Sequence, residues 1–298
     1  RAKAAFLRVR EAEARNGAVE SPDIGNDLMG IRMGFFSDPV LMLWKYRSLL
    51  RQTTWSDISA RFAGSVLGLL WLVAYPLVFL GTYALVFIVI LKAKIPGQFE
   101  PTEYAVMIFC GLVPFIGFIE ALNLGVVSVT SNANLIKNTL FPIELIPVKT
   151  VLSSQCTQVV GTVMLLIAVV AIDRLTWWAL MLPAVWILQI MFSLGLIWIL
   201  SSLNVIMRDL QAIMGVVTLL LMIGSPIYWT AEMVPEKMRP WMGLNPLYHM
   251  ILSYRGILMM GRWPMYGVFW KLLILAFVTF FVGYWFFSRM KKVFVDNV

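Results

Sequence analysis

One uncharged stretch sets most of what this chain can fold into. From Ser65 to Leu91 the sequence contains no charged side chain. As an α-helix this stretch would be about 40 Å long, whereas the hydrocarbon core of a bilayer is about 30 Å thick. It therefore predicts a transmembrane helix with length to spare, and Pro76 within it predicts a bend.

Similar apolar stretches recur along the rest of the chain. Hydrophobic residues make up 60% of it and the mean hydropathy is +0.82, which indicates an all-α polytopic membrane protein rather than a soluble one. We expect residues 1–37 to form an N-terminal extension and linker of unassigned role, and residues 38–298 to form one transmembrane domain. The six transmembrane helices are predicted at 65–91, 104–129, 151–172, 177–200, 212–229 and 268–287.

The basic residues follow the predicted spans. The net charge is +8, but the cations are spread over the segments that flank the spans and form no patch with interleaved aromatics, which argues against nucleic-acid binding. If both termini lie in the cytoplasm, the inner segments hold about twice as many Lys and Arg residues as the outer ones. This bias predicts cytoplasmic N and C termini.

Two inner segments have the composition of short surface helices. Residues 38–63 mix aromatics with cations, which is typical of an amphipathic helix on the inner membrane surface or packed against the bundle; the two are compatible. Residues 132–147 are too short and polar to cross a bilayer, and they predict a coupling helix, ended by Pro142, that would dock on a soluble partner. Its apolar side would carry Leu135, Ile136 and Leu140, and its polar side Asn134, Lys137 and Asn138.

Prolines interrupt the segment between the fifth and sixth predicted spans. A helix with so many breaks cannot cross a membrane continuously. We therefore expect residues 230–262 to form two short re-entrant helices near the outer surface.

A carboxylate, Glu120, lies within the second predicted span. A charge in this position costs about 3 kcal/mol on insertion scales. We expect Glu120 to be protonated, paired, or directed towards water or the bundle interior. It would serve either in translocation or in a structural hydrogen bond between helices.

Aromatic residues recur every four positions along the first span, at Trp71, Tyr75, Phe79 and Tyr83. The stripe drifts by about 40° per step around a helix with 3.6 residues per turn, so it can face one neighbour or cavity over much of its length. One interpretation is lipid contact and helix packing. The other is a wall on which sugar rings stack weakly, so that a polymer keeps moving.

The sequence contains no GxxxxGK[ST], HExxH or GxSxG motif. Cys110, Cys156 and His249 are too few to suggest a metal site. The chain is therefore not expected to be an enzyme or to bind a cofactor or metal, and any energy for transport would come from a partner.

Three motifs resemble one family, the membrane subunits of ABC-2 type polysaccharide exporters, which are the permeases for O-antigen, capsule and teichoic acid. The first comprises Arg61-Phe62, Ser65, Leu67-Gly68, Trp71 and Pro76. The others are Gly111-Leu112-Val113-Pro114-Phe115 and Asn245-Pro246-Leu247.

The resemblance implies a homodimer in the bacterial cytoplasmic membrane, with two copies of a separate ATP-binding subunit that would use ATP and Mg²⁺. The substrate would be a glycan on a polyprenyl diphosphate lipid, whose anionic head would meet cations such as Arg51 or Arg61, and residues 230–262 would form an outer gate. The substrate channel is predicted to involve Trp71, Tyr75, Phe79, Tyr83, Phe115, Glu120, Tyr228 and Trp229. Contacts with the ATPase are predicted for Trp44, Arg51, Arg61, Asn134, Lys137, Asn138, Leu140 and Phe141.

Three other functions remain open from the residues alone. An ABC-2 exporter of a drug or lipid would share the architecture. A membrane-embedded glycan-processing enzyme would use Glu120 as its acid or base. A passive channel is disfavoured because it would have no use for an inner docking helix.

Overall fold

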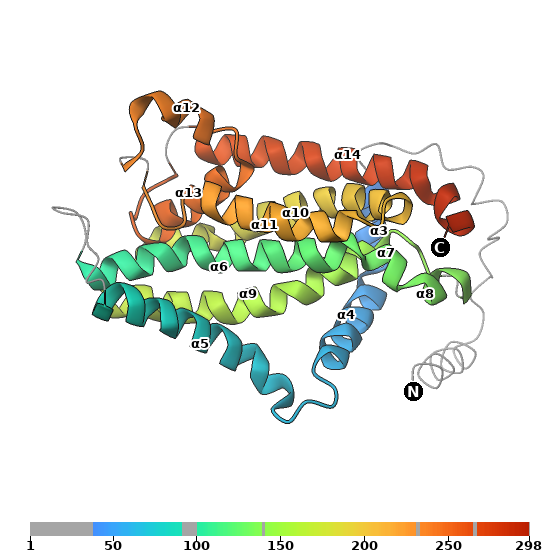
Figure 1. Ribbon diagram of the computed structural model, residues 1–298, viewed down its shortest axis with the longest axis horizontal. Coiled ribbons are helices and arrows are strands. Elements are labelled where there is room, and N and C mark those ends of the chain that lie inside the picture. Colours follow the sequence, from blue (N-terminus) through green and yellow to red (C-terminus); the bar gives the residue numbers. More distant parts are fainter. Residues whose placement is uncertain (1–37, 91–99, 139–140, 231–232, 265–266, 298) are drawn as a thin grey trace. The chain divides into compact units, whose positions relative to one another are not determined.

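The computed structural model describes residues 38–90, 100–138, 141–230, 233–264 and 267–297 (Figure 1). The chain divides into residues 1–38, almost all outside the described ranges, and residues 39–298, to which everything below refers. All regular structure in the described ranges is helical. The predicted N-terminal extension, 1–37, lies outside the described residues.

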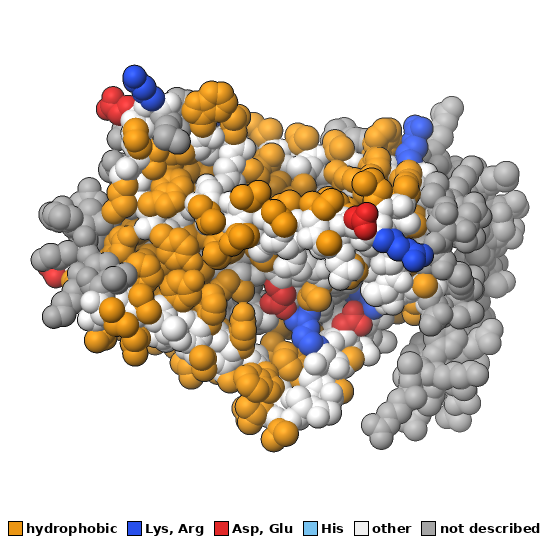
Figure 2. Space-filling view, viewed as in Figure 1, with side chains coloured by type: hydrophobic (Ala, Val, Ile, Leu, Met, Phe, Trp, Pro, Cys, Tyr) orange, Lys and Arg blue, Asp and Glu red, His pale blue; other side chains and the backbone are white. Residues whose placement is uncertain are grey.

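Among the described residues, five helices are long and apolar enough to cross a membrane, which confirms the all-α polytopic class. Figure 2 shows hydrophobic side chains along the length of the bundle, and charged ones towards its ends and in a hollow on one side. The first span joins η1 (Gly68–Leu70), α5 (Trp71–Ala84) and the π-helical η2 (Leu85–Ile90). The others are α6 (Pro101–Val126), α9 (Leu145–Ala171), η3 with α10 (Trp177–Met181 and Leu182–Ile206), and α14 (Val268–Asn297).

The shorter helices lie before, between and after these spans. They are α3 (Asp38–Lys45), α4 (Arg47–Arg61), α7 (Ser128–Ser131), α8 (Ala133–Asn138), α11 (Leu210–Gly224), η5 (Glu236–Met238), α12 (Arg239–Met242) and α13 (Pro246–Leu258). Because α8 follows the end of α6 and α12 precedes the start of α14, they lie towards opposite ends of the bundle, which we name the α8 end and the α12 end (Figure 1).

At the α8 end, two span boundaries in the structure differ from the predicted ones. The second span ends at Val126 instead of 129, and α7 follows it. The third span begins at Leu145 instead of 151, because Pro147 falls in the first turn of α9, where a helix needs no backbone N–H group. The predicted coupling segment is therefore α8 with a connection, and its last residues belong to α9.

The prediction of a helical fifth span over 212–229 was wrong. Here α11 has 15 residues and ends at Gly224, so it is about 22 Å long and shorter than the bilayer core. Ser225 is extended, with φ −102° and ψ 148°, because the following Pro226 disfavours the helical conformation at the residue before it. The chain continues without helix towards the α12 end.

Two carbonyl groups of this irregular stretch accept hydrogen bonds from one buried arginine, Arg255 of α13, which is 1% exposed. Its Nη2 donates to the carbonyl oxygen of Ile227 at 2.7 Å, and its Nη1 to that of Trp229 at 3.1 Å. Its Nε donates to the carbonyl oxygen of Met107 in α6 at 3.2 Å. Non-helical backbone at membrane depth is tolerated where protein groups satisfy it, and Arg255 does so here.

The motif residues Asn245 and Gly111 hold α13 in position. The Asn245 Oδ1 caps α13 by accepting from the Leu247 N–H at 2.9 Å, while its Nδ2 donates to the carbonyl oxygen of Gly224 at 3.0 Å. A Cβ on Gly111 would lie 3.1 Å from Cγ2 of Ile251, so glycine lets α13 approach α6 closely. Two of the three motifs therefore meet at the broken span.

A polar network joins four helices inside the bundle. The Tyr254 hydroxyl of α13 donates to Oε1 of Gln189 in α10 at 2.7 Å, and the Gln158 Nε2 of α9 donates to the same oxygen at 3.0 Å. The Gln189 Nε2 donates to the carbonyl oxygen of Pro114 in α6 at 3.0 Å. Gly117 leaves the space that the Gln158 side chain fills. The network fixes α13 to the long spans.

We expect Arg255→Met to destabilise the fold strongly. It would leave the carbonyl groups of Met107, Ile227 and Trp229 without their donor, and a buried unsatisfied polar group costs about 1–3 kcal/mol. The measurement is the thermal unfolding midpoint of the detergent-solubilised protein. The exposed Arg262 supplies the control, since Arg262→Met should leave the midpoint unchanged. Equal midpoints for the two variants would contradict the assigned role of Arg255.

Candidate functional site

The interface helix α4 packs against α9 at the α8 end of the bundle. Leu50 and Ile58 are buried on the packed side, whereas Trp44 of α3 and Trp55 of α4 are exposed. The segment is therefore amphipathic as predicted, with one side on the bundle and aromatic rings left on the surface.

Two ion pairs fasten α4 to the long spans. Arg61, at the end of α4, pairs with Glu120 of α6. Lys149 of α9 is buried; its Nζ lies 3.0 Å from Oδ2 of Asp57 in α4 and donates to Oδ1 of Asn132 at 3.2 Å. Figure 2 shows basic and acidic side chains meeting in the hollow where α4 faces α6 and α9.

The ion pair with Arg61 shows how the Glu120 carboxylate is accommodated within a membrane span. Glu120 lies about midway between the middle of α6 and its end at Val126, in the half of the span that faces the α8 end. Sequence analysis assigned Arg61 to the ATPase contact and Glu120 to the channel, whereas the structure joins them. No spacing in the sequence indicated this pairing.

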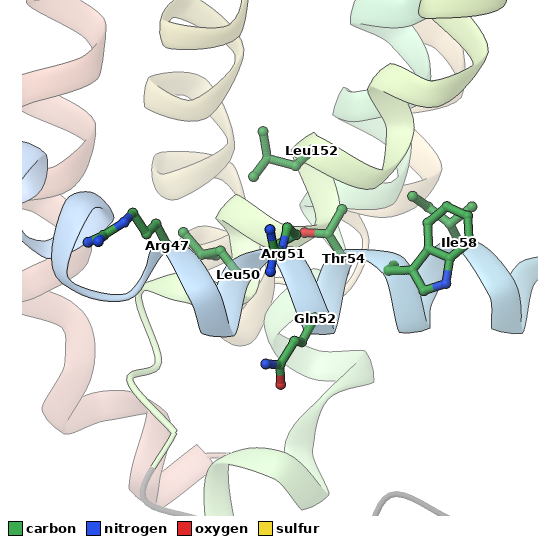
Figure 3. A pocket seen from close by; sticks show the side chains of 8 residues that line it. Arg47, Leu50, Arg51, Gln52, Thr54, Ile58 and Leu152 are labelled. Carbon is green, nitrogen blue, oxygen red and sulfur yellow. The ribbon is translucent and has the colours of Figure 1, made fainter. Parts of the chain in front are cut away.

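A cavity of about 680 Å³ lies beside α4 and is open on one side (Figure 3). It is lined by Arg47, Leu50, Arg51, Gln52, Thr54, Trp55, Ile58 and Leu152. Figure 3 shows Gln52 pointing away from Leu152 of α9, while Arg51 and Thr54 lie on the nearer side of α4. Cations beside an apolar floor suit an anionic group attached to a hydrocarbon chain.

The two arginines of this cavity differ in their partners. The Arg47 guanidinium lies 4.8 Å from the Trp44 ring centroid and donates to the Trp44 carbonyl oxygen at 3.0 Å. Arg51 makes no ion pair with any described residue. Among the same residues, the buried Thr54 Oγ1 has no hydrogen-bond partner. The exposed Arg51 is therefore available to a ligand.

The aromatic stripe of the first span forms a ladder of rings. Centroids are 6.0 Å apart for Tyr75 and Phe79, 5.0 Å for Phe79 and Tyr83, and 6.2 Å for Tyr83 and Phe87. Tyr228 stacks on Tyr83 at 6.0 Å and on Phe87 at 6.2 Å. Sequence analysis missed Phe87, although it continues the four-residue spacing.

The ladder is open at one end and covered at the other. Trp71 is 44% exposed and Tyr75 is 52% exposed. At the α12 end, the hydroxyl oxygens of Tyr83 and Tyr228 are 2.9 Å apart, and the Tyr104 hydroxyl donates to the Tyr228 carbonyl oxygen at 2.7 Å.

Two of the residues predicted for the channel do not belong to the ring ladder. Phe115 is buried in the core of this chain, so we leave it out of the candidate sugar-facing surface. Trp229 is half-buried, and its carbonyl oxygen is bonded by Arg255. Phe115 belongs to a motif that packs α6 into the bundle, which explains its place in the motif without a channel role.

The predicted coupling segment is described in part. Asn134, Lys137 and Asn138 belong to α8, Leu140 lies outside the described residues, and Phe141 is half-buried. Beyond them, the buried Glu144 forms an ion pair with Lys291 of α14, a contact that sequence analysis missed because nothing in the sequence relates these distant positions.

Comparison with known proteins identifies the family. The model of the ABC-2 type transporter family matches residues 48–259. Two relatives from Klebsiella pneumoniae, each named O-antigen export system permease protein RfbA, are 31% identical over 83% of this chain and 94% of the relative, and 32% identical over 72% and 81%. A relative of the same name from Myxococcus xanthus is 29% identical over 74% and 84%. With five candidate membrane spans and this match, the chain belongs to the ABC-2 type transporter family, as a multi-pass membrane transport subunit.

Proposed function

We propose that this chain is the permease subunit of an ATP-driven exporter that moves a polyprenyl-diphosphate-linked polysaccharide across the bacterial cytoplasmic membrane. The polysaccharide would be of the O-antigen, capsule or teichoic-acid type. The observation that carries the proposal is the partly exposed ring ladder on α5, in a chain whose relatives are named O-antigen export permeases.

The ladder suits a polymer better than a single small molecule. Flat rings stack on ligand faces through dispersion, without the directional bonds that would hold one sugar firmly. Four rings in series, from Tyr75 to Phe87, offer a moving chain successive weak contacts, and conduction requires weak, multiple sites. In a homodimer, a second ladder would line the same path.

The cavity beside α4 supports a diphosphate lipid as the carrier of the glycan. Arg51 would meet the diphosphate, because charge-assisted hydrogen bonds to phosphate oxygens are strong. Leu50, Ile58 and Leu152 would contact the first isoprenoid units. Arg61 is already paired with Glu120, so we assign the head to Arg51 in preference to Arg61.

Energy would come from two copies of a separate ATP-binding subunit that uses ATP and Mg²⁺. The α8 end would lie in the cytoplasm with both chain termini, and α8 would be the main contact with the ATPase. An ATP-driven approach of the two ATPase subunits would push the α8 helices and shift the spans between closed and open states.

The strongest rival is an ABC-2 exporter of a small anionic amphiphile, which the cavity beside α4 would also fit. Such a substrate would not need the ring ladder. A glycan-processing enzyme that uses Glu120 is less well supported, because that carboxylate is already paired with Arg61.

The ladder gives the first test of the proposal. We expect Trp71→Ala with Tyr75→Ala to lower export of surface polysaccharide several-fold while ATP hydrolysis by the purified complex stays within about twofold. Export is measured by complementing a strain that lacks this chain. The control pair Val73→Ala and Leu77→Ala alters exposed apolar residues of the same helix. Equal loss of export and hydrolysis in the ladder variant would contradict the proposal.

The coupling segment gives a second test. Leu140→Asp should lower export and co-purification of the ATPase, because it places a charge on the predicted apolar side of the docking helix, while the protein stays in the membrane. Leu175→Asp, at an exposed site in the turn before η3, is the control. Normal export by the Leu140 variant would argue against docking through this segment.

A third test addresses the head group. Arg51→Gln should weaken binding of a polyprenyl diphosphate to the purified protein at least tenfold, since a charge-assisted bond contributes roughly 1.5–3 kcal/mol. Binding is measured by titration calorimetry, with the exposed Lys45→Gln, which lies outside the cavity, as the control. Unchanged affinity in the Arg51 variant would rule out this head-group site.

A further inference from the structure

Glu144 is the point at which the connection from α8 meets two other helices. It is the N-cap residue of α9, and its side chain is 8% exposed. Its carboxylate pairs with the ammonium group of Lys291 in α14. Its carbonyl oxygen accepts a hydrogen bond from Nε1 of Trp198 in α10 at 3.2 Å. One residue is therefore bonded to α10 through its backbone and to α14 through its side chain.

The two helices that receive these bonds are packed as one body. A Cβ on Gly195 would collide with the carbonyl group of Thr279, and one on Gly283 with the carbonyl group of Gly195. The fully buried Trp198 ring lies 5.2 Å from the Phe280 ring and 5.4 Å from the Tyr284 ring. Backbones in such close contact cannot slide independently, so a displacement of Glu144 would act on both.

The other end of α8 is also fixed. Asn132, directly before α8, accepts a hydrogen bond from Lys149 of α9, and Lys149 pairs with Asp57 of α4. Asn132, before α8, is thus linked through Lys149 to α4, and Glu144, after α8, is linked to α10 and α14. Both flanks of α8 are therefore tied to the bundle, so a push on α8 would reach these contacts.

The pair between Glu144 and Lys291 suits the transmission of small movements. A mostly buried carboxylate is stable only while its cation stays close, so α14 must follow Glu144. We propose that Glu144 and Lys291 are positioning residues that, with Trp198, pass the movement of α8 to the unit of α10 and α14. This inference rests on the proposed function, in which α8 receives the ATP-driven push.

The test compares charge-removing and charge-keeping variants in the full complex with its ATPase, reconstituted in proteoliposomes with the lipid-linked glycan. We expect Glu144→Gln and Lys291→Gln to lower the glycan moved per ATP hydrolysed at least fivefold, with hydrolysis and the thermal midpoint near those of the unaltered complex. Lys291→Arg should keep the ratio, because it keeps the charge. Lys271→Gln, on the exposed surface at the other end of α14, should also keep it.

Two results would overturn the inference: an unchanged ratio in Lys291→Gln, or an equal loss in Lys291→Arg and Lys291→Gln. If Glu144→Gln fails to fold, the two variants of the less buried Lys291 still decide the matter. Absence of glycan transport by the unaltered complex would instead contradict the proposed function, so the two failures can be told apart.

Discussion

A backbone carbonyl group inside a membrane needs a hydrogen-bond donor. This fold is arranged around the residues that follow α11, where the helix no longer supplies such donors. The helical hydrogen bonding of α11 stops at Gly224, and carbonyl groups from Gly224 onward accept hydrogen bonds from Asn245, Arg255 and Tyr104. Each donor requires close approach: Gly111 admits α13 to α6, and Asn245 starts α13 beside α11. The position of α13, and with it the end of the ring ladder at Tyr228, follows from satisfying these groups.

Hydropathy and proline positions were sufficient to predict the helical class, the long spans to within a few residues at most ends, and the short helices after the fifth span. They were insufficient for α11, because the apolar character of the sequence continues past Gly224 while the backbone changes conformation at Pro226. At the candidate site, the four-residue spacing predicted the ladder, but Tyr228 joins it only through the tertiary fold. The cost of a charge in the membrane predicted that Glu120 needs a partner, yet insertion energies do not identify Arg61.

The ion pairs at the α8 end form a connected set. Arg61 with Glu120, Asp57 with Lys149, and Glu144 with Lys291 join α4, α6, α9 and α14. Salt bridges of this kind contribute little net stability when compared with apolar packing, but their energy changes steeply with the distance between the two charged groups. In a transporter moved by another protein, such contacts would give the spans a defined relation to the docking helix in each state.

The π-helical turn η2 has a geometric consequence for the ladder. Along an ordinary helix, residues four apart rotate steadily away from one line, because each turn holds 3.6 residues. A π-helical segment, with i→i+5 hydrogen bonds, is wound more widely and holds more than four residues per turn, so the same spacing rotates the opposite way. Phe87 lies in this segment, and its ring is within 14° of parallel to Tyr228, as the Tyr83 ring is within 11°. The wider winding thus keeps Phe87 on the same side of the helix as Tyr83, where both rings stack on Tyr228. Regular α-helical hydrogen bonding in this segment would rotate Phe87 away from Tyr228.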